Sequence, residues 1–485
     1  MKAQNTELWG MTSLGGSSSY PNGGVIFKIN EDGSGFQALK SFHNLPNGLD
    51  PVGHLLKATN GSLYAMTVNG GDSSSSAPLG NGVLFNFNPV GNVYSDIMNF
   101  DTASGTGNQP NGSLIQATNG KLYGMTKYGG DMSIGNDGGG TLFSLDPTNN
   151  SFTVLINFNY NTGCCAFGSL LQANNGKLYG MTFGGGDTTL NHGSGYGVIF
   201  SYDILTNTYT KLFNFDNSNG ANPLGNLIQA TNGLLYGMTY YGGSDTNHWG
   251  NNNVSTGAGV IFSFDITNNT YTVVHNFDSA HGALPFGSLM QASNGLLYGM
   301  TSGTSGNNGN IFSLDPSSNN FIDLHDFNYS DGSGPLGDLI QASNGKLYGM
   351  TSDGGIDSAG TIFNYDISNN TYTKMFDFDF INGFDPIGSF IELPQGTGIN
   401  ELMAIDEQIS VYPNPATTLL HIHQSLPSPN QQLIITDLLG NEVYTETLPS
   451  IVNYQLSIAN WNAGLYFYEI RTEKGSERGK FVVQK

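Results

Sequence analysis

The fold is decided by the stretch GSLIQATNGKLYGMT at residues 112–126, in which one apolar run ends at Asn119-Gly120 and a second follows directly. Asn-Gly between two such runs is the strongest short-range signal of a β-hairpin with a type I′ turn. The stretch returns as GSLLQANNGKLYGMT at 168–182 and as GDLIQASNGKLYGMT at 337–351. We therefore predict one hairpin that is repeated along the chain.

Four short β-like runs make up each repeat: a (GSLIQA), b (KLYGMT), c (GVIFSYD) and d (TYTKLFNF). The aromatic residue of run b recurs at Trp9, Tyr64, Tyr123, Tyr179, Tyr236, Tyr298 and Tyr348. Run a starts at Gly53, Gly112, Gly168, Gly225, Gly287, Gly337 and Gly388. Run d ends at Phe42, Phe100, Phe158, Phe215, Phe277, Phe327 and Phe378. Four strands in a unit of about 50 residues are typical of a β-propeller blade.

The two ends of the repeat region complement each other. The chain begins with runs b, c and d, and the repeats end with a lone run a, GSFIEL, at 388–393. We predict that this C-terminal strand completes the first blade, which gives a closed seven-bladed propeller over residues 1–393. An open solenoid is the alternative, although it would leave this strand unused and would need caps. The glycine of LYGMT is expected where a side chain of another blade packs on bare backbone.

The composition favours a folded, turn-rich β protein. Of 485 residues 68 are glycine, only 11% are charged and 12% are aromatic. The net charge of −22 disfavours nucleic acid and anionic membranes as partners. No apolar stretch approaches the roughly 20 residues of a transmembrane helix.

The repeat phrases LYGMT, GVIF and GSLIQA-x-NG resemble the GloVer-type ("choice-of-anchor") tandem repeats over residues 8–393. That family usually reads LYGTT where this chain has LYGMT. The resemblance implies a tandem-repeat protein and assigns no catalytic residue, because the family has no agreed activity.

The composition changes at 394–408, which we predict to be a linker. Alternating short runs follow in 409–485, with a terminal hairpin around Lys474-Gly475, and predict a small Ig-like β-sandwich. The tail resembles the C-terminal sorting domain, type A, of type IX secretion (Por) cargo. The residues that carry this resemblance are Tyr412-Pro413-Asn414-Pro415, Asp437 to Val443 with Gly440, Gly464-Leu465-Tyr466 and Gly479-Lys480-Phe481-Val482.

This second resemblance implies export through the outer membrane of a Bacteroidetes-type bacterium, with the type IX machinery as a partner of residues 409–485. The product is then secreted or attached to the cell surface. Such cargo carries an N-terminal secretory leader, whereas the start MKAQNTELWG is too short and too polar to be one. We therefore expect the leader to be missing from this sequence.

A ligand site is expected on one face of the propeller. In a blade of order a–b–c–d the longer b–c and d–a links share a face, and variable loops on a rigid scaffold carry function. Aromatic side chains there can stack on sugar rings or anchor a protein partner, or they can simply pack between blades. The candidates in or beside the b–c links are Tyr128, Phe183, Tyr196, Tyr240, Tyr241 and Trp249.

Metal and thiol chemistry have weaker signals. Asp101, Asp216, Asp278 and Asp379 each follow the last Phe of run d, either as oxygen ligands for a structural Ca²⁺ or as turn residues that bond their own backbone, and we favour the turn. His192 and His248 occupy matching b–c links, but no carboxylate or thiol stands at ligand spacing. Cys164 and Cys165, which are adjacent, either form a vicinal disulfide or remain two thiols.

We predict a non-enzymatic protein that binds a glycan or a protein. Residues 1–393 contain no arginine, the side chain that best grips the substrate carboxylate of sialidases and uronate lyases. The alternatives are a carbohydrate-active hydrolase or lyase and a purely structural or adhesive repeat protein.

Overall fold

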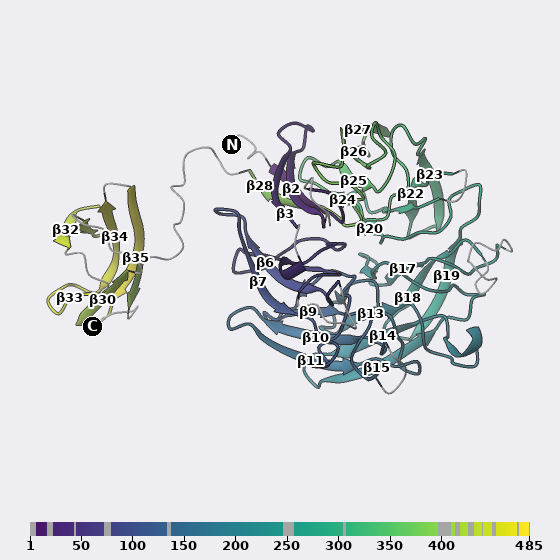
Figure 1. Cartoon of the computed structure of the whole chain (residues 1–485), viewed down its shortest axis with the longest axis horizontal. Helices are drawn as coiled ribbons and strands as arrows, with labels where there is room; N and C mark the ends of the chain where they lie inside the picture. Colours follow the sequence, from purple (N-terminus) through teal and green to yellow (C-terminus); the bar gives the residue numbers. More distant parts are fainter. Residues whose placement is uncertain are drawn as a thin grey trace. The chain divides into compact units, whose positions relative to one another are not determined.

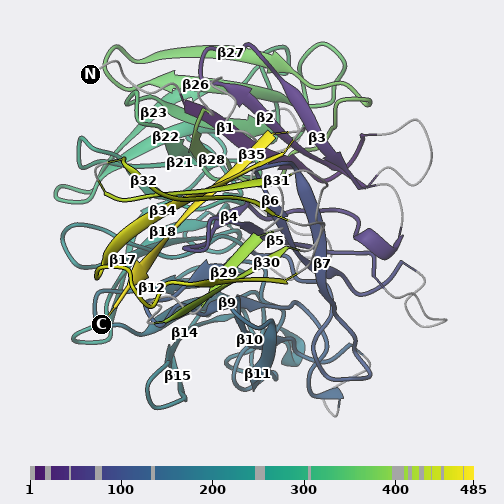
Figure 2. The same ribbon diagram turned by 90° about the vertical axis from the view of Figure 1, so that its left-hand side faces the viewer.

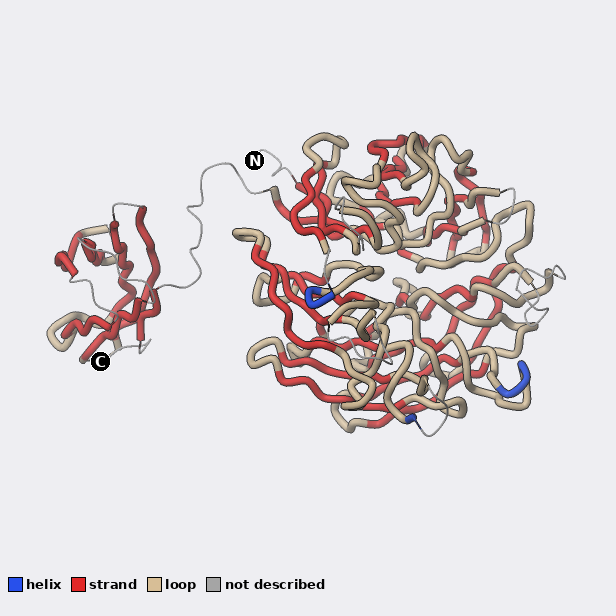
Figure 3. Tube along the Cα trace, in the orientation of Figure 1, coloured by secondary structure: helices blue, strands red, loops and turns tan. Residues whose placement is uncertain are grey.

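The computed structural model describes residues 6–16, 23–42, 45–71, 79–132, 137–245, 257–303, 307–395, 409–412, 418–424, 431–438, 440–448, 453–472 and 475–484. The chain divides into two compact units; the first comprises Met1–Asn88 and Tyr94–Gln395, and the second includes Gly396–Lys485. Strands dominate both units (Figures 1 and 3). The fold is therefore all-β, and the first unit is propeller-like.

The described part of the first unit contains seven sheets of four strands each, all with the order a–b–c–d. Sheet 1 is β28 (Ile391–Pro394), β1 (Thr6–Thr12), β2 (Val25–Asn30) and β3 (Gln37–Ser41). Sheet 2 is β4 (Leu56–Lys57), β5 (Leu63–Thr67), β6 (Val83–Asn88) and β7 (Val93–Asn99). Sheet 3 is β8 (Ile115–Gln116), β9 (Leu122–Met125), β10 (Thr141–Asp146) and β11 (Ser151–Asn157). Sheet 4 is β12 (Leu171–Gln172), β13 (Leu178–Thr182), β14 (Val198–Asp203) and β15 (Thr208–Asn214).

The remaining three sheets repeat this pattern. Sheet 5 is β16 (Ile228–Gln229), β17 (Leu235–Thr239), β18 (Val260–Asp265) and β19 (Thr270–Asn276). Sheet 6 is β20 (Met290–Gln291), β21 (Leu297–Thr301), β22 (Asn310–Asp315) and β23 (Asn320–Asp326). Sheet 7 is β24 (Ile340–Gln341), β25 (Leu347–Thr351), β26 (Thr361–Asp366) and β27 (Thr371–Asp377).

The predicted hairpin forms, but the predicted type I′ turn is wrong. A type I′ turn needs a positive φ at both central residues, and Asn119 does not have one. The amide of Gly120 instead donates to the carbonyl of Ala117 at 2.8 Å, and that of Ala117 to the carbonyl of Lys121 at 3.0 Å, so the loop has three residues and ends on a left-handed glycine. Ile115 pairs with Tyr123 and Gln116 with Leu122 across the turn. Gly120 has φ 81, a left-handed conformation that favours glycine. The Asn119 side chain accepts from the amide of Lys121 at 3.1 Å and donates to the Tyr123 hydroxyl at 2.8 Å. The turn is thus held by side chains that the repeat itself carries.

The C-terminal strand of the repeats completes sheet 1, as predicted (Figure 2). β28 pairs with β1 antiparallel, from Thr6 opposite Pro394 to Trp9 opposite Ile391. The two ends of the repeat region are therefore joined by backbone hydrogen bonds.

The hydrophobic cores lie between neighbouring sheets. One cluster joins Leu8 and Phe27 of sheet 1 to Tyr348 and Met350 of sheet 7. Equivalent clusters join each further pair of consecutive sheets. Strands b and c are buried on both faces for this reason, whereas strand d, at the outer edge, is half exposed. Each buried Phe or Leu side chain contributes roughly 1.5–3 kcal/mol to stability.

The prediction for the glycine of LYGMT is wrong in one respect. A Cβ on Gly180 would lie 2.7 Å from Cζ of Phe200 and 3.0 Å from Cδ2 of Leu170. Both side chains belong to the glycine's own sheet, and Phe200 is its direct partner in strand c. The phenylalanine ring lies across the bare backbone beside it, so the contact is made within a sheet and not between sheets.

The long links share one face, as predicted. Isolated β-bridges join the d–a link that leads into a sheet to the b–c link of that same sheet. Examples are Asn108 with Tyr128, Cys164 with Gly184 and Ala221 with Tyr241. The short a–b and c–d turns lie at the other ends of the strands.

The second unit contains two sheets over its described residues. β29 (Ile409–Tyr412), β30 (Leu419–Gln424) and β33 (Asn453–Ser457) form one, and β32 (Glu442–Leu448), β31 (Gln431–Thr436), β34 (Gly464–Thr472) and β35 (Gly475–Val483) form the other. Leu420, Leu456, Leu433 and Ile470, which belong to both sheets, are buried in one core. β34 and β35 form the terminal hairpin expected around Lys474-Gly475.

Candidate functional site

Seven residues that precede strand a bend the chain toward the centre of the first unit. Each has a positive φ, and each amide donates to a carbonyl of the preceding sheet, as Cys165 does to Gly139 at 2.9 Å. The seven are Asp50, Gln109, Cys165, Asn222, Leu284, Gly334 and Asp385. Proline follows in every case except after Cys165. These links therefore enter the centre with one geometry but with six different residue types.

The repeated glycine that starts run a lies where the sheets meet. A Cβ added to any of these seven glycines would overlap the carbonyl oxygen of the corresponding glycine in the next sheet. The contacts run in order from Gly53 to Gly388, and a Cβ on Gly388 would meet the oxygen of Gly53. Only glycine permits so close an approach of backbones.

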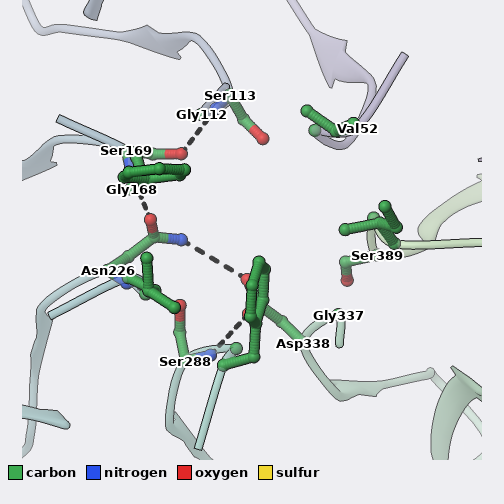
Figure 4. A pocket seen from close by; sticks show the side chains of 18 of the residues that line it. Val52, Gly112, Ser113, Gly168, Ser169, Asn226, Ser288, Gly337, Asp338 and Ser389 are labelled. Carbon is green, nitrogen blue, oxygen red and sulfur yellow. Dashed lines mark hydrogen bonds between the residues drawn. The ribbon is translucent and has the colours of Figure 1, made fainter. Parts of the chain in front are cut away.

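A ring of hydrogen bonds follows directly after the glycines (Figure 4). The amide of Ser113 donates to Ser169 Oγ at 2.6 Å, and that of Ser169 donates to Asn226 Oδ1. The amide of Asn226 donates to Ser288 Oγ at 2.7 Å, and that of Ser288 to Asp338 Oδ1 at 2.6 Å. Each bond links one sheet to the next.

His54 adds a titratable group to this ring. Its amide donates to Ser113 Oγ at 2.8 Å, and its Nδ1 lies 2.8 Å from the same oxygen. Burial lowers the pKa of His54, although the charge of Asp338 opposes that shift. The imidazole is therefore neutral at neutral pH.

A central cavity of about 110 Å³ lies between these layers. Its apolar walls come from the residues immediately before the glycines, namely Val52, Phe167, Leu224, Phe286, Leu336 and Ile387, with Asn111 at the seventh place. Its polar walls come from the residues immediately after the glycines, namely Ser113, Ser169, Asn226, Ser288, Asp338 and Ser389. Apolar walls with a few converging polar groups are the usual lining of a ligand site.

Two of the predicted aromatic residues pack on this cavity's wall. The rings of Phe183 and Phe167 lie 5.3 Å apart, and those of Tyr240 and Phe286 lie 6.2 Å apart. The ammonium of Lys127 lies over the Phe167 ring at 4.5 Å. Phe183 and Tyr240 are thus placed between the cavity and the long-link face.

Sequence reasoning missed Phe167 and Phe286. Their signal is positional: they stand directly before the repeated glycine, where other repeats have Val, Asn, Leu or Ile. It also missed three exposed aromatic residues of the d–a links, Tyr160, Tyr329 and Phe380.

The other predicted aromatic residues are partly buried beside the sheets. Tyr128 lies beneath the ammonium of Lys127 at 4.6 Å. Tyr196 packs on the core between sheets 4 and 5, and Tyr241 on the core between sheets 5 and 6. Trp249 and His248 lie outside the described residues. His192 is exposed in a short 3₁₀ helix, η3 (Asn191–Gly193).

The four aspartates that follow strand d stabilise backbone turns, because their carboxylates accept hydrogen bonds from nearby amides. Oδ1 of Asp379 accepts from the amides of Ile381 and Asn382, at 2.9 and 2.6 Å. Asp101, Asp216 and Asp278 accept equivalent backbone hydrogen bonds. Within the described residues no group of three or more His, Cys, Asp and Glu is arranged to hold a metal ion.

Cys164 and Cys165 face each other in the d–a link of sheet 4, with their sulfurs 3.2 Å apart. The hydrogen bond between them raises the pKa of the Cys164 thiol and lowers that of Cys165. Cys165 is thus the more readily ionised thiol of the pair.

The predicted sorting residues are distributed over the second unit. Gly464 and Tyr466 begin β34, and Tyr466 packs in the core. Gly440 has φ 84 in the turn between β31 and β32. Tyr412 ends β29, while Gly479 and Lys480 lie in β35. Pro413, Asn414 and Pro415 lie outside the described residues.

Solved structures share the fold of the first unit. The periplasmic gluconolactonase of Pseudomonas aeruginosa is 13% identical, with a TM-score of 0.52 over 80% of this chain and 99% of that one. A candidate 6-phosphogluconolactonase of Bacteroides fragilis is 15% identical, with a TM-score of 0.51 over 81% and 99%. At such identities the likeness shows a propeller-like fold alone.

None of the curated proteins compared with the chain matches it. No helix among the described residues is both long and apolar enough to cross a membrane. Residues 410–484 match the secretion system C-terminal sorting domain, which indicates export by the type IX system to the cell surface or the extracellular space. Residues 1–250, 132–308 and 246–399 match the Gloeobacter/Verrucomicrobia repeat, and the chain belongs to this repeat family.

Proposed function

We propose that the protein is an exported seven-bladed β-propeller, over residues 1–393, that binds a glycan or protein ligand without transforming it. A linker at 394–408 would join it to an Ig-like sorting domain at 409–485. The seven four-stranded sheets and the pairing of β28 with β1 support the blade count. The two-sheet core of the second unit supports a sandwich.

One observation carries the binding site: the side chains that differ between repeats converge on the central cavity, while the strands stay the same. Phe167 and Phe286 line the cavity, and Phe183 and Tyr240 pack against them toward the long-link face. Aromatic surfaces of this kind stack on sugar rings and anchor protein partners. The ligand would therefore approach the long-link face at its centre.

A glycan array and a protein-interaction screen with the full chain, combined with a polysaccharide hydrolysis assay, test this function. Binding without release of reducing ends is expected. Release of reducing ends would show a hydrolase, and newly formed unsaturated uronates would show a lyase. Neither binding nor turnover would leave a structural or adhesive role.

A further inference from the structure

The central cavity contains one charged side chain among its lining residues, the carboxylate of Asp338. Oδ1 accepts from the amide of Ser288 at 2.6 Å, and Oδ2 accepts from Asn226 Nδ2 at 3.4 Å. A carboxylate has about four acceptor positions, so it can take further donors. No lysine or arginine lines the cavity, and a partly buried carboxylate is stabilised by a cation.

The ring of hydrogen bonds is open beside this carboxylate. Five of its seven junctions carry an amide-to-side-chain bond, from His54 round to Asp338. Over the described residues, the amides of Asp338 and Ser389 and the hydroxyl of Ser389 have no hydrogen bond. Figure 4 shows Asp338, Ser389 and Ser113 around one central space. Two hydroxyls and a carboxylate therefore line the same cavity from different sides.

The wall on the other side of the glycines is apolar. Phe167, Phe286, Leu224, Leu336 and Ile387 line it. At ~30 Å³ for each water, the cavity of about 110 Å³ has the size of several water molecules. An ammonium group with a short alkyl stem matches both walls, because its three N–H donors suit the oxygens and its stem suits the apolar ring.

The charge of the first unit favours a cation as well. Residues 1–393 contain ten lysines, no arginine and 28 acidic residues, a net charge of −18. The neutral imidazole of His54 does not repel a cation.

We infer that the polar end of the central cavity binds a primary ammonium group on a short apolar stem, either the lysyl side chain of a polypeptide or a free alkylamine. Asp338 neutralises the charge, while Ser389 and Ser113 accept the remaining N–H donors. The inference rests on the proposed function, since it names the chemistry of a ligand for the same cavity.

Isothermal titration of the full chain at neutral pH and constant salt tests the inference with two probes. One is n-butylammonium, and the other is the peptide acetyl-Gly-Gly-Lys-Gly-Gly-amide. Their neutral counterparts are n-butanol and the same peptide with an acetylated lysine Nε. We expect both ammonium probes to bind, and the neutral probes to bind at least about tenfold more weakly. If the natural ligand is a polypeptide, the peptide should bind more tightly than n-butylammonium.

Two variants locate the effect. Asp338→Asn keeps the oxygen that accepts from Ser288, and Ser389→Ala removes a hydroxyl on which no described contact depends. Asp338→Asn should weaken ammonium binding at least about tenfold, and Ser389→Ala a few-fold. Asp146→Asn, at the end of β10, removes the same charge elsewhere and should change binding less than about twofold.

Equal binding of charged and neutral probes, or unchanged binding in both Asp338→Asn and Ser389→Ala, would overturn the inference. The array result separates this failure from failure of the proposed function. A glycan or protein ligand that binds while both ammonium probes fail would leave the binding function intact and remove only the ammonium assignment.

Discussion

At the scale of single residues, four positions of the stretch at 112–126 have separate structural roles. Gly112 permits contact with the backbone of the next sheet. The Ser113 hydroxyl accepts a hydrogen bond from the amide of His54, which belongs to the preceding sheet. Asn119 holds the turn, and Gly124 accommodates the ring of Phe143. The stretch is repeated because each sheet must make the same contacts with both neighbours.

We predict that Gly337→Ala destabilises the first unit. A Cβ on Gly337 would overlap the carbonyl oxygen of Gly388, so the sheets would have to move apart. The free energy of unfolding, measured in urea, should fall by about 2 kcal/mol or more. Gly120→Asn is the matched control, because Gly120 has open space and asparagine tolerates its positive φ. Equal stability of Gly337→Ala and the parent would contradict the close approach of the glycines.

At the scale of elements, a second set of hydrogen bonds ties the a–b turns together. The glutamine of run a reaches the turn of the preceding sheet; for example, Gln172 accepts from the amide of Thr118 at 2.8 Å and donates to its own Gly176 at 2.9 Å. Sheet 1 has no a–b turn, because its strand a comes from the end of the repeats. Sheet 2, which follows sheet 1, accordingly has Lys57 in place of the glutamine, and Lys57 is exposed.

This difference gives a matched pair of substitutions. Gln172→Ala leaves the Thr118 amide and the Gly176 carbonyl without their partner and should lower the free energy of unfolding by about 1–2 kcal/mol. Lys57→Ala removes a side chain that has no such bond and should change stability by less than ~0.5 kcal/mol. Thermal and urea unfolding measure both, and equal losses in the two variants would refute the role of the glutamines.

The strands d stack on one another through aromatic pairs, and two of these pairs contain histidine. His275 stacks on Phe321 at 4.0 Å, and His325 stacks on Tyr372 at 3.9 Å. Phe213 stacks on Tyr271 in the same way between sheets 4 and 5. Burial lowers the pKa of both histidines, against the opposing charges of nearby aspartates.

The histidines should make the first unit less stable in mild acid. Below the ordinary pKa of about 6.5 the unfolded chain binds protons that the folded chain does not. The free energy of unfolding should therefore fall as the pH drops below that value, until the lowered pKa of the folded state is reached. His275→Phe with His325→Phe, which copies the Phe213 stack, should flatten this part of the profile. Identical pH profiles for the variant and the parent would contradict the assignment.

The sequence predicted the elements well because the relevant signals are local and repeated. Asn-Gly turns, four runs per unit and the complementary ends were sufficient for the hairpins, the shared face of the long links and the pairing of β28 with β1. It could not predict which side chains meet at the centre. Strands b and c are buried on both faces, so period-two alternation is absent, and the contacts of Phe167 with Phe183 depend on distant backbone geometry.

At the scale of the whole molecule, the second unit determines where the protein goes. Deleting residues 409–485 should leave the repeat region folded but retained inside a bacterium that has the type IX system, because the sorting domain is removed. Immunoblots of culture supernatant, cell surface and periplasm would show this. Export of the shortened chain at the parental level would contradict the assignment of the sorting domain.

The central claim is that the ligand binds where the repeats differ, at the centre of the long-link face. The most direct measurement is the affinity of the full chain for the best ligand from the array, for the parent, for Phe183→Ala with Tyr240→Ala, and for Leu205→Ala. Leu205 is exposed in the turn between β14 and β15, on the opposite face. Loss of two aromatic contacts should weaken binding about tenfold or more, while Leu205→Ala should bind as the parent does. Unchanged affinity in the double variant, or an equal loss in Leu205→Ala, would contradict a site at the centre of this face.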